Sequence, residues 1–246
     1  VSYALAAFPT LTRLFSKGDH KDFVEHMIDS SRHIIFWSIP ISVMFIVLRA
    51  QIVRTILGAG RFNWEDTRLT AAALALFTIS LVAQNLVALF VRSYYSQGKT
   101  KTPLIMNVFS ALLIVVGSLY LVDLFKNSFH FRYFIESILK VPDISGTIVL
   151  MLPLGYSIGV IINLIIHWVG FSYHFPSFSK PVLRTLYEVI SSSIIMGYVT
   201  YISLGIFDNI FNINTLLGIF FQGFFVCFLG IITATIVLVF LENREF

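Results

Sequence analysis

The residues that could do chemistry inside the long apolar runs of this chain are neutral amides and hydroxyls. Gln84 and Asn85 are adjacent in one uncharged run, and Asn163 lies in a later one. A buried amide without a hydrogen-bond partner is costly, so these side chains should face protein or water. Their ordinary role is hydrogen bonding between helices, worth about 0.6 kcal/mol on average. The functional alternative, for which we take them as candidates, is the wall of a polar cavity that receives a headgroup or an ion.

Arginines supply a second candidate chemistry, the binding of an anion. Between residues 49 and 68 the chain carries Arg49, Arg54, Arg61 and Arg68. Guanidinium groups donate paired hydrogen bonds to phosphates and carboxylates. We therefore take Arg49, Arg54 and Arg61 as candidates for contact with a substrate.

Catalytic and cofactor chemistry finds no support in the sequence. No Ser/His/Asp set, paired carboxylates or glycine-rich phosphate loop is visible, which argues against an enzyme, including a membrane-embedded glycosyl or acyl transferase. Cys227 is the single cysteine, and the histidines lack metal-ligand spacing, so we expect no metal and no cofactor. The net charge of +4 comes without a long basic patch. This pattern excludes nucleic acid as a partner and suits anionic membrane lipids.

The elements that must position these residues are membrane spans. Of 246 residues, 57% are hydrophobic and 12% are charged, whereas a soluble domain has about 25% charged residues. Roughly 20 apolar residues in a helix cross the hydrocarbon core of a bilayer. We therefore predict an all-α polytopic membrane protein. Its six complete spans are predicted at residues 33–48, 69–91, 102–122, 146–168, 186–207 and 216–241.

Two shorter segments precede the first complete span. Residues 1–12 are uncharged and apolar, and we interpret them as the end of a truncated transmembrane helix. Residues 13–32 form a predicted cytoplasmic amphipathic segment, in which Asp19 can cap a new helix. That helix either lies along the membrane surface or extends directly into the next span, and the sequence leaves both alternatives open.

Prolines and one polar insertion modify the pattern of spans. Pro40 and Pro153 lie within predicted spans and should kink them. Residues 123–143 mix charges with aromatic and aliphatic side chains. This mixture predicts a short amphipathic helix that rests on the membrane surface and ends at Pro142.

The orientation of the spans follows from the distribution of Lys and Arg. If residues 13–32 are cytoplasmic, the cytoplasmic segments hold ten of the 17 Lys and Arg residues and the outer segments hold seven. This bias has the sign of the positive-inside rule. The arginine-rich segment 49–68 then lies on the outer side, where it needs a structural or functional reason.

Four separated motifs resemble one family of transporters. They are AAFPTLTRLFSKGDHKDF at residues 6–23, IP at 39–40, VLRAQIVRTILGAGRFNWEDT at 47–67 and RSYYSQGKTKTP at 92–103. In this order they resemble the MurJ (MviN) lipid II flippases, which belong to the superfamily of multidrug, oligosaccharidyl-lipid and polysaccharide exporters. Two features depart from the family: Lys99 stands where an Asp is usual, and the segment 123–143 is longer than the usual connection.

The resemblance implies a two-lobed transporter of fourteen helices, of which this chain is the C-terminal lobe. Such a protein moves the undecaprenyl-diphosphate-linked peptidoglycan precursor, lipid II, across the bacterial cytoplasmic (inner) membrane by alternating access. Cell-wall synthesis proteins are further partners that the resemblance suggests. The cationic cavity of the family is lined mostly by arginines of the other lobe, which lie outside this chain. Residues 33–184 would form the lobe, and the last two spans, within 185–246, would form an apolar groove for the lipid tail.

The resemblance also suggests residues for the groove and for ion coupling. In the last two spans we take as groove candidates Ser192, Gly197, Gly218 and Gln222. The predicted spans contain no carboxylate, and Asp123 at the end of one span is the nearest. We take as ion-coupling candidates Ser118, Asp123 and Ser157.

Two other functions remain open at the level of the sequence. The chain could belong to an exporter of another lipid-linked oligosaccharide or of drugs, because only the charge of the missing cavity would discriminate between cargoes. It could also be a membrane scaffold that transports nothing.

Overall fold

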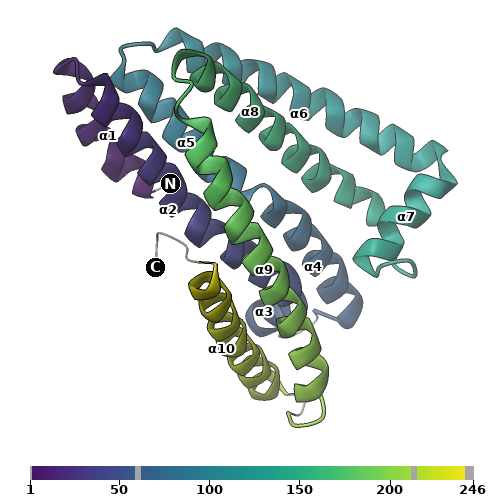
Figure 1. Ribbon diagram of the computed structural model, residues 1–246. Helices are drawn as coiled ribbons and strands as arrows, with labels where there is room; N and C mark the ends of the chain where they lie inside the picture. Colours follow the sequence, from purple (N-terminus) through teal and green to yellow (C-terminus); the bar gives the residue numbers. More distant parts are fainter. Residues whose placement is uncertain (1, 59–61, 212–214, 242–246) are drawn as a thin grey trace.

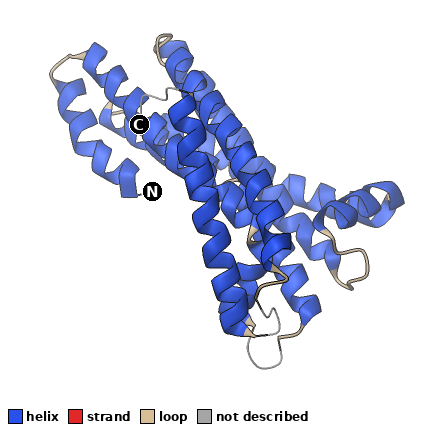
Figure 2. Ribbon diagram, turned by 60° about the horizontal axis from the view of Figure 1, so that its bottom comes forward, coloured by secondary structure: helices blue, strands red, loops and turns tan. Residues whose placement is uncertain are grey.

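The computed structural model describes residues 2–58, 62–211 and 215–241, and within these ranges it contains helices and loops but no strand (Figure 2). The predicted all-α class is therefore confirmed. The helices are α1 (Ser2–Ser16), α2 (His20–Val47), α3 (Arg49–Leu57), α4 (Trp64–Ile79), α5 (Leu81–Ser96), α6 (Lys101–Asn127), α7 (Phe129–Leu139), the short 3-10 helix η1 (Thr147–Leu150), α8 (Met151–His174), α9 (Ser179–Phe207) and α10 (Leu216–Phe240).

The long helices pack side by side as an elongated bundle (Figure 1). The most extensive contacts join α6 with α8, α9 with α10, and α2 with α9, while α5 packs against α1, α2 and α8. Among the described residues, six helical segments are long and apolar enough to cross a membrane: His20–Val47, Trp64–Ser96, Lys101–Asn127, Thr147–His174, Ser179–Phe207 and Leu216–Phe240. The predicted number of complete spans is confirmed, although several of these helices are longer than the sequence indicated.

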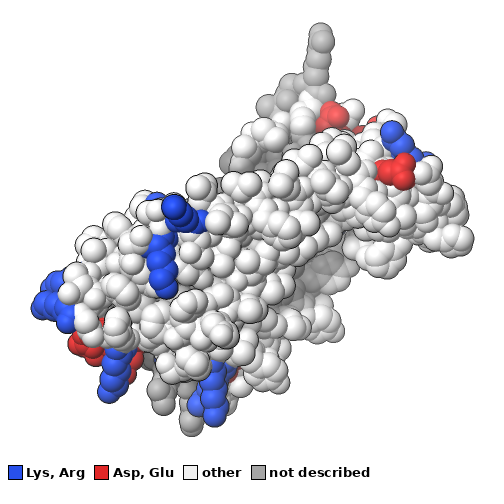
Figure 3. All heavy atoms as spheres, turned by 90° about the horizontal axis from the view of Figure 1, so that it is seen from above, with Lys and Arg blue, Asp and Glu red and all other residues white. Residues whose placement is uncertain are grey.

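The exposed surface of the bundle agrees with the assignment of these helices as membrane spans. On the face drawn in Figure 3, charged side chains lie toward the two ends and the surface between them is uncharged. On α6, large apolar side chains such as Leu112, Val116 and Leu119 are exposed. An apolar belt between charged ends is the surface that a bilayer requires.

The segment predicted to be amphipathic is continuous with the first span. Gly18 adopts a left-handed conformation, with φ of +77°, and Asp19 caps α2 by accepting a hydrogen bond from the backbone N–H of Asp22 at 3.2 Å. From His20 the helix then runs without interruption to Val47. The structure therefore has the second of the two alternatives, a helical extension of the span, and residue 32 is not a boundary between elements.

The second predicted span, residues 69–91, is not one continuous helix. It is divided at Ser80 into α4 and α5. The Ser80 hydroxyl donates to the carbonyl of Phe77 at 2.8 Å and accepts from Gln84 Nε2 at 2.9 Å. A serine hydroxyl that binds a nearby carbonyl competes with regular helical hydrogen bonding and can bend a helix.

The two prolines that were predicted to kink spans occupy different positions in their helices. Pro153 lies in the first turn of α8, where its missing N–H costs no helical hydrogen bond. Pro40 lies inside α2, which continues through it as a helix. The kink at Pro40 therefore stays a prediction, and a separate interruption lies at Ser80.

The insertion at residues 123–143 is also divided differently from the prediction. Its first residues complete α6, and the following helix, α7, ends at Leu139, before Pro142, because Lys140 adopts a left-handed conformation with φ of 59°. Leu139 packs into a buried cluster with residues of α4 and α8. The segment therefore closes one end of the bundle.

Small residues set the close approach of α6 and α8. A Cβ atom added to Gly155 would lie 2.3 Å from Ser118 Oγ and 2.9 Å from Ser118 Cα. One added to Gly159 would lie 2.2 Å from a side-chain carbon of Ile114. In a membrane, where apolar burial does not drive helix association, such close backbone packing is a main source of stability.

We predict that Gly155→Ala lowers the midpoint of thermal unfolding of the purified protein in detergent. The added methyl group meets the α6 backbone, and overpacking of this kind costs about 1–3 kcal/mol. Gly117→Ala on α6 is the matched control, because a Cβ atom there meets nothing within 4 Å. Equal midpoints for the two variants would contradict the packing described here.

Candidate functional site

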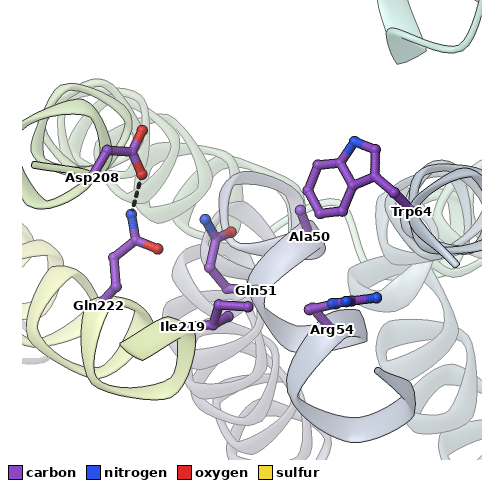
Figure 4. A pocket seen from close by; sticks show the side chains of 7 residues that line it. All are labelled: Ala50, Gln51, Arg54, Trp64, Asp208, Ile219 and Gln222. Atoms are coloured by element: carbon purple, nitrogen blue, oxygen red, sulfur yellow. Dashed lines mark hydrogen bonds between the residues drawn. The ribbon is translucent and has the colours of Figure 1, made fainter. Parts of the chain in front are cut away.

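A cavity of about 530 Å³ opens where α3, the start of α4, the end of α9 and the start of α10 meet. We call it the polar cavity, and Figure 4 shows the side chains around it. Its lining residues are Ala50, Gln51, Arg54, Trp64, Asp208, Ile219 and Gln222. Its volume lies within the range of about 300–1,000 Å³ that is typical of ligand pockets.

Arg54 and Trp64 form one side of the polar cavity (Figure 4). Arg54 Nη1 donates to the carbonyl oxygen of Phe62 at 3.2 Å, which holds the guanidinium group beside the start of α4. There Asn63 and Asp66 form a reciprocal capping box that fixes Trp64 as the first helical residue. The sequence therefore positions the cation and the indole through local capping.

Gln222 and Asp208 form the opposite side of the polar cavity (Figure 4). The Gln222 side chain is buried, and its Nε2 donates to the Asp208 carboxylate and, at 3.3 Å, to the carbonyl of Leu204. These bonds join the first turns of α10 to the end of α9. The cavity thus holds a cation on one side and an anion on the other.

An apolar groove of about 360 Å³ lies beside the polar cavity, between α10 and the α2–α3 corner. The two share Gln51 and Ile219 as lining residues. The remaining residues of the apolar groove are Met44, Phe45, Leu48, Ile52, Thr55, Ile56, Phe220, Gly223, Phe224 and Cys227. A polar cavity joined to an apolar groove has the general form of a site for a molecule with a polar head and an apolar tail.

Two residues predicted from the sequence for different roles line the polar cavity. Arg54 was a candidate for contact with a substrate, and Gln222 was a candidate for the groove that holds a lipid tail. The other candidate arginines do not line the polar cavity. Arg49 is half-buried and donates to the carbonyl of Leu139 at 3.4 Å, so it joins α3 to the end of α7. Burial lowers the pKa of its guanidinium group below the ordinary value. Arg61 lies outside the residues that the structure describes.

The amides predicted for a cavity wall lie elsewhere, and their roles differ. Asn85 Nδ2 donates to Ser38 Oγ on α2 at 3.4 Å. Asn163 Nδ2 donates to Asn107 Oδ1 at 2.9 Å and thereby joins α8 to α6. Gln84 is exposed on the surface of the chain and donates to Ser80 in its own helix. Of the three, Gln84 is therefore the one that faces away from the bundle.

The other groove candidates pack helices together. Ser192 Oγ donates to the carbonyl of Ala234 at 3.2 Å, which joins α9 to α10. A Cβ atom on Gly197 would lie 2.7 Å from a side-chain carbon of Val43 on α2. The backbone N–H of Gly218 donates to the Thr215 hydroxyl at 3.1 Å and so completes the cap of α10.

The ion-coupling candidates have separate partners. Ser157 Oγ donates to the carbonyl of Leu76 on α4 at 2.6 Å. Ser118 is buried against Gly155 of α8. Asp123 is exposed and accepts a hydrogen bond from Asn127 at 3.0 Å. No ligand set that includes all three emerges from these contacts.

The sequence analysis missed Gln51, Trp64 and Asp208 as residues of the polar cavity. They are separated along the chain and belong to three different elements. One signal could have found them. Alternation of the predicted spans places segment 49–68 and the turn after the fifth span on the same side of the membrane.

Comparison with known proteins decides the family. The family model described as "Lipid II flippase MurJ" matches residues 1–222. The chain belongs to the MurJ family. The MurJ lipid II flippase of Thermosipho africanus (strain TCF52B) is 33% identical over 105 residues, which are 42% of this chain and 22% of that protein. A probable MurJ lipid II flippase of Rickettsia prowazekii (strain Madrid E) is 27% identical over 126 residues, 51% of this chain and 25% of that protein.

A solved structure supports the same fold. A protein described as lipid II flippase MurJ in an inward closed conformation aligns with a TM-score of 0.63 and 22% sequence identity. The alignment covers 96% of this chain and 42% of that chain. The present chain therefore spans less than half of the solved relative, and the comparison confirms the MurJ-like, all-helical membrane fold.

We predict that Gln222→Leu destabilises the contact between α9 and α10. The change removes two hydrogen bonds and leaves the Asp208 carboxylate without this donor, which should cost about 1–3 kcal/mol. The measurement is the midpoint of thermal unfolding in detergent. Ser191→Ala is the control, because the Ser191 hydroxyl donates only within its own helix, to the carbonyl of Tyr187 at 2.9 Å. A shift no larger than that of the control would contradict the assigned bonds.

Proposed function

We propose that the protein to which this chain belongs moves lipid II across the bacterial cytoplasmic membrane for cell-wall synthesis. Membership of the MurJ family supports this, and so do the names of its relatives, which are described as lipid II flippases or probable lipid II flippases. The six candidate spans agree with a multi-pass membrane protein. On this proposal the substrate is undecaprenyl-diphosphate-linked, and the protein is a transporter rather than an enzyme.

The structural observation that best supports transport is the exposure of Gln84. This amide lies within the candidate span Trp64–Ser96, yet it faces away from the bundle. A polar side chain directed into lipid is unfavourable, so such residues normally face protein or a water-filled cavity. We infer that Gln84 faces a wet path, whose other walls belong to parts of the protein outside this chain.

In this proposal the described helices act as one lobe during alternating access. Transporters of this kind move largely by rigid-body rocking of one bundle against another. Hydrogen bonds such as Ser157 to Leu76 and Ser192 to Ala234 join neighbouring helices and would keep the lobe together. The last two helices, α9 and α10, would carry the lipid tail along their apolar surface.

The orientation follows from the same proposal. The Lys and Arg bias places residues 13–32 in the cytoplasm, so the polar cavity and the apolar groove lie at the outer face of the membrane. Proteins of cell-wall synthesis are expected as neighbours of the transporter there.

The test is complementation with the full-length gene. The protein is expressed in a bacterium depleted of its own lipid II flippase, and lipid II on the outer leaflet is assayed. We expect growth and lipid II exposure to be restored. Correct membrane insertion without restored exposure would contradict the proposed cargo and favour a different lipid-linked oligosaccharide.

A pair of variants separates the transport role from the structural one. Gln84→Leu should lower lipid II exposure while the thermal unfolding midpoint stays the same, because Gln84 makes its hydrogen bond within its own helix. Asn85→Leu should lower the midpoint, because Asn85 bonds to Ser38 on another helix. Full transport by a well-inserted Gln84→Leu protein would remove Gln84 from the path.

A further inference from the structure

The polar cavity is lined by one cationic and one anionic side chain, which come from opposite sides of it. Arg54 lies on one side and Asp208 on the other, with Gln51 and Ile219 between them (Figure 4). A ligand that complements both groups carries one negative and one positive charge. The headgroup of a zwitterionic phospholipid has this arrangement.

The Arg54 side suits a phosphate. Its hydrogen bond to the carbonyl of Phe62 holds the guanidinium group at the wall of the cavity. A guanidinium group has five N–H donors, so one such bond leaves donors for an anion. Arginine binds phosphate oxygens through paired, charge-assisted hydrogen bonds.

The opposite side suits an ammonium group. The Asp208 carboxylate accepts one hydrogen bond from Gln222, and a carboxylate can accept several. Within the part of the chain that the structure describes, Gln51 Oε1 is buried and has no hydrogen-bond partner. Gln51 also lines the polar cavity, so a ligand there that carries N–H donors would satisfy this oxygen. A primary ammonium group offers three donors, whereas a quaternary ammonium offers none.

The apolar groove continues from the polar cavity and suits an acyl chain. It shares Gln51 and Ile219 with the cavity and extends along α10 past Gly223 to Cys227. Gly223 lies against Gln51, since a Cβ atom there would be 3.5 Å from Gln51 Cβ, an ordinary contact distance. Trp64 is 58% exposed at the polar end, where an indole is favoured at the headgroup level of a membrane.

We propose that the polar cavity and the apolar groove together bind one aminophospholipid. Its phosphate contacts Arg54, its ammonium group contacts Asp208 and Gln51, and one acyl chain fills the groove. An anionic phospholipid fits less well, because it has no ammonium group for Asp208. The diphosphate of lipid II also fits less well, because Arg54 is the one cation among the described residues that line the cavity. The site would therefore hold a lipid distinct from the transported substrate.

The test is native mass spectrometry of the purified full-length protein with added phosphatidylethanolamine or phosphatidylglycerol. We expect the wild-type protein to retain phosphatidylethanolamine in preference to phosphatidylglycerol. Arg54→Ala should weaken phosphatidylethanolamine binding about tenfold, as expected for the loss of a charge-assisted pair. Asp208→Asn should abolish the preference between the two lipids. Gly223→Leu should reduce binding of both, because the new side chain occupies the groove.

Arg184→Ala is the matched control for loss of a cation. Arg184 pairs with Glu188 at 2.8 Å on α9, and it does not line the polar cavity or the apolar groove. This variant should retain phosphatidylethanolamine as the wild type does. Equal retention of the two lipids by the wild type, or an unchanged preference in Asp208→Asn, would overturn the proposal. Displacement of phosphatidylethanolamine by lipid II would overturn the distinction from the substrate.

A second measurement uses the wild-type protein alone and so does not depend on whether the variants fold. Phosphatidylethanolamine should raise the thermal unfolding midpoint of the wild-type protein more than phosphatidylglycerol does, because a ligand of the folded state stabilises it. Equal shifts would contradict the proposal without the use of any variant. Since both measurements report binding, their failure would leave the proposed lipid II transport untouched.

Discussion

A bilayer core supplies no hydrogen-bond partners, and this constraint accounts for most of the polar contacts in the structure. Three side chains inside the candidate spans show this: Asn163 bonds to Asn107, Ser157 to the carbonyl of Leu76, and Ser192 to that of Ala234. Each of these bonds joins two different helices. Neutral hydrogen bonds and close contacts at glycines thus hold the lobe together, in a solvent where apolar burial between helices contributes little.

The same constraint applies to the candidate functional residues, which include Gln84 and the residues that line the polar cavity and the apolar groove. Gln84 is exposed within a candidate span, where a polar side chain requires protein or water beside it. The polar cavity lies at the ends of the spans, where Arg54 and Asp208 can remain charged near water. The apolar groove leads from there toward the middle of α10. Arg54 and Asp208 thus lie at the ends of the spans, whereas the hydrogen bonds between helices named above are made by neutral side chains.

The sequence correctly predicted the features of the fold that depend on composition and on local capping residues. Six spans follow from apolar length, and the start of α2 follows from Asp19. The break at Ser80 could not be predicted, because Ser31 and Ser42 also bond to helix carbonyls and yet lie inside the continuous α2. The polar cavity combines residues as distant as Gln51 and Asp208, so no local spacing reveals it. Membership of the family was correctly predicted from motifs within the first part of the chain.

The central claim is that the described helices form one body that moves as a unit during transport. Distance measurements between spin labels in the full-length protein test it directly, with labels at Ile105 on α6 and Tyr198 on α9, which are 67% and 66% exposed. The account predicts the same distance distribution with and without lipid II, because neutral hydrogen bonds and glycine contacts join the intervening helices. A distribution that shifts when lipid II is added would contradict it.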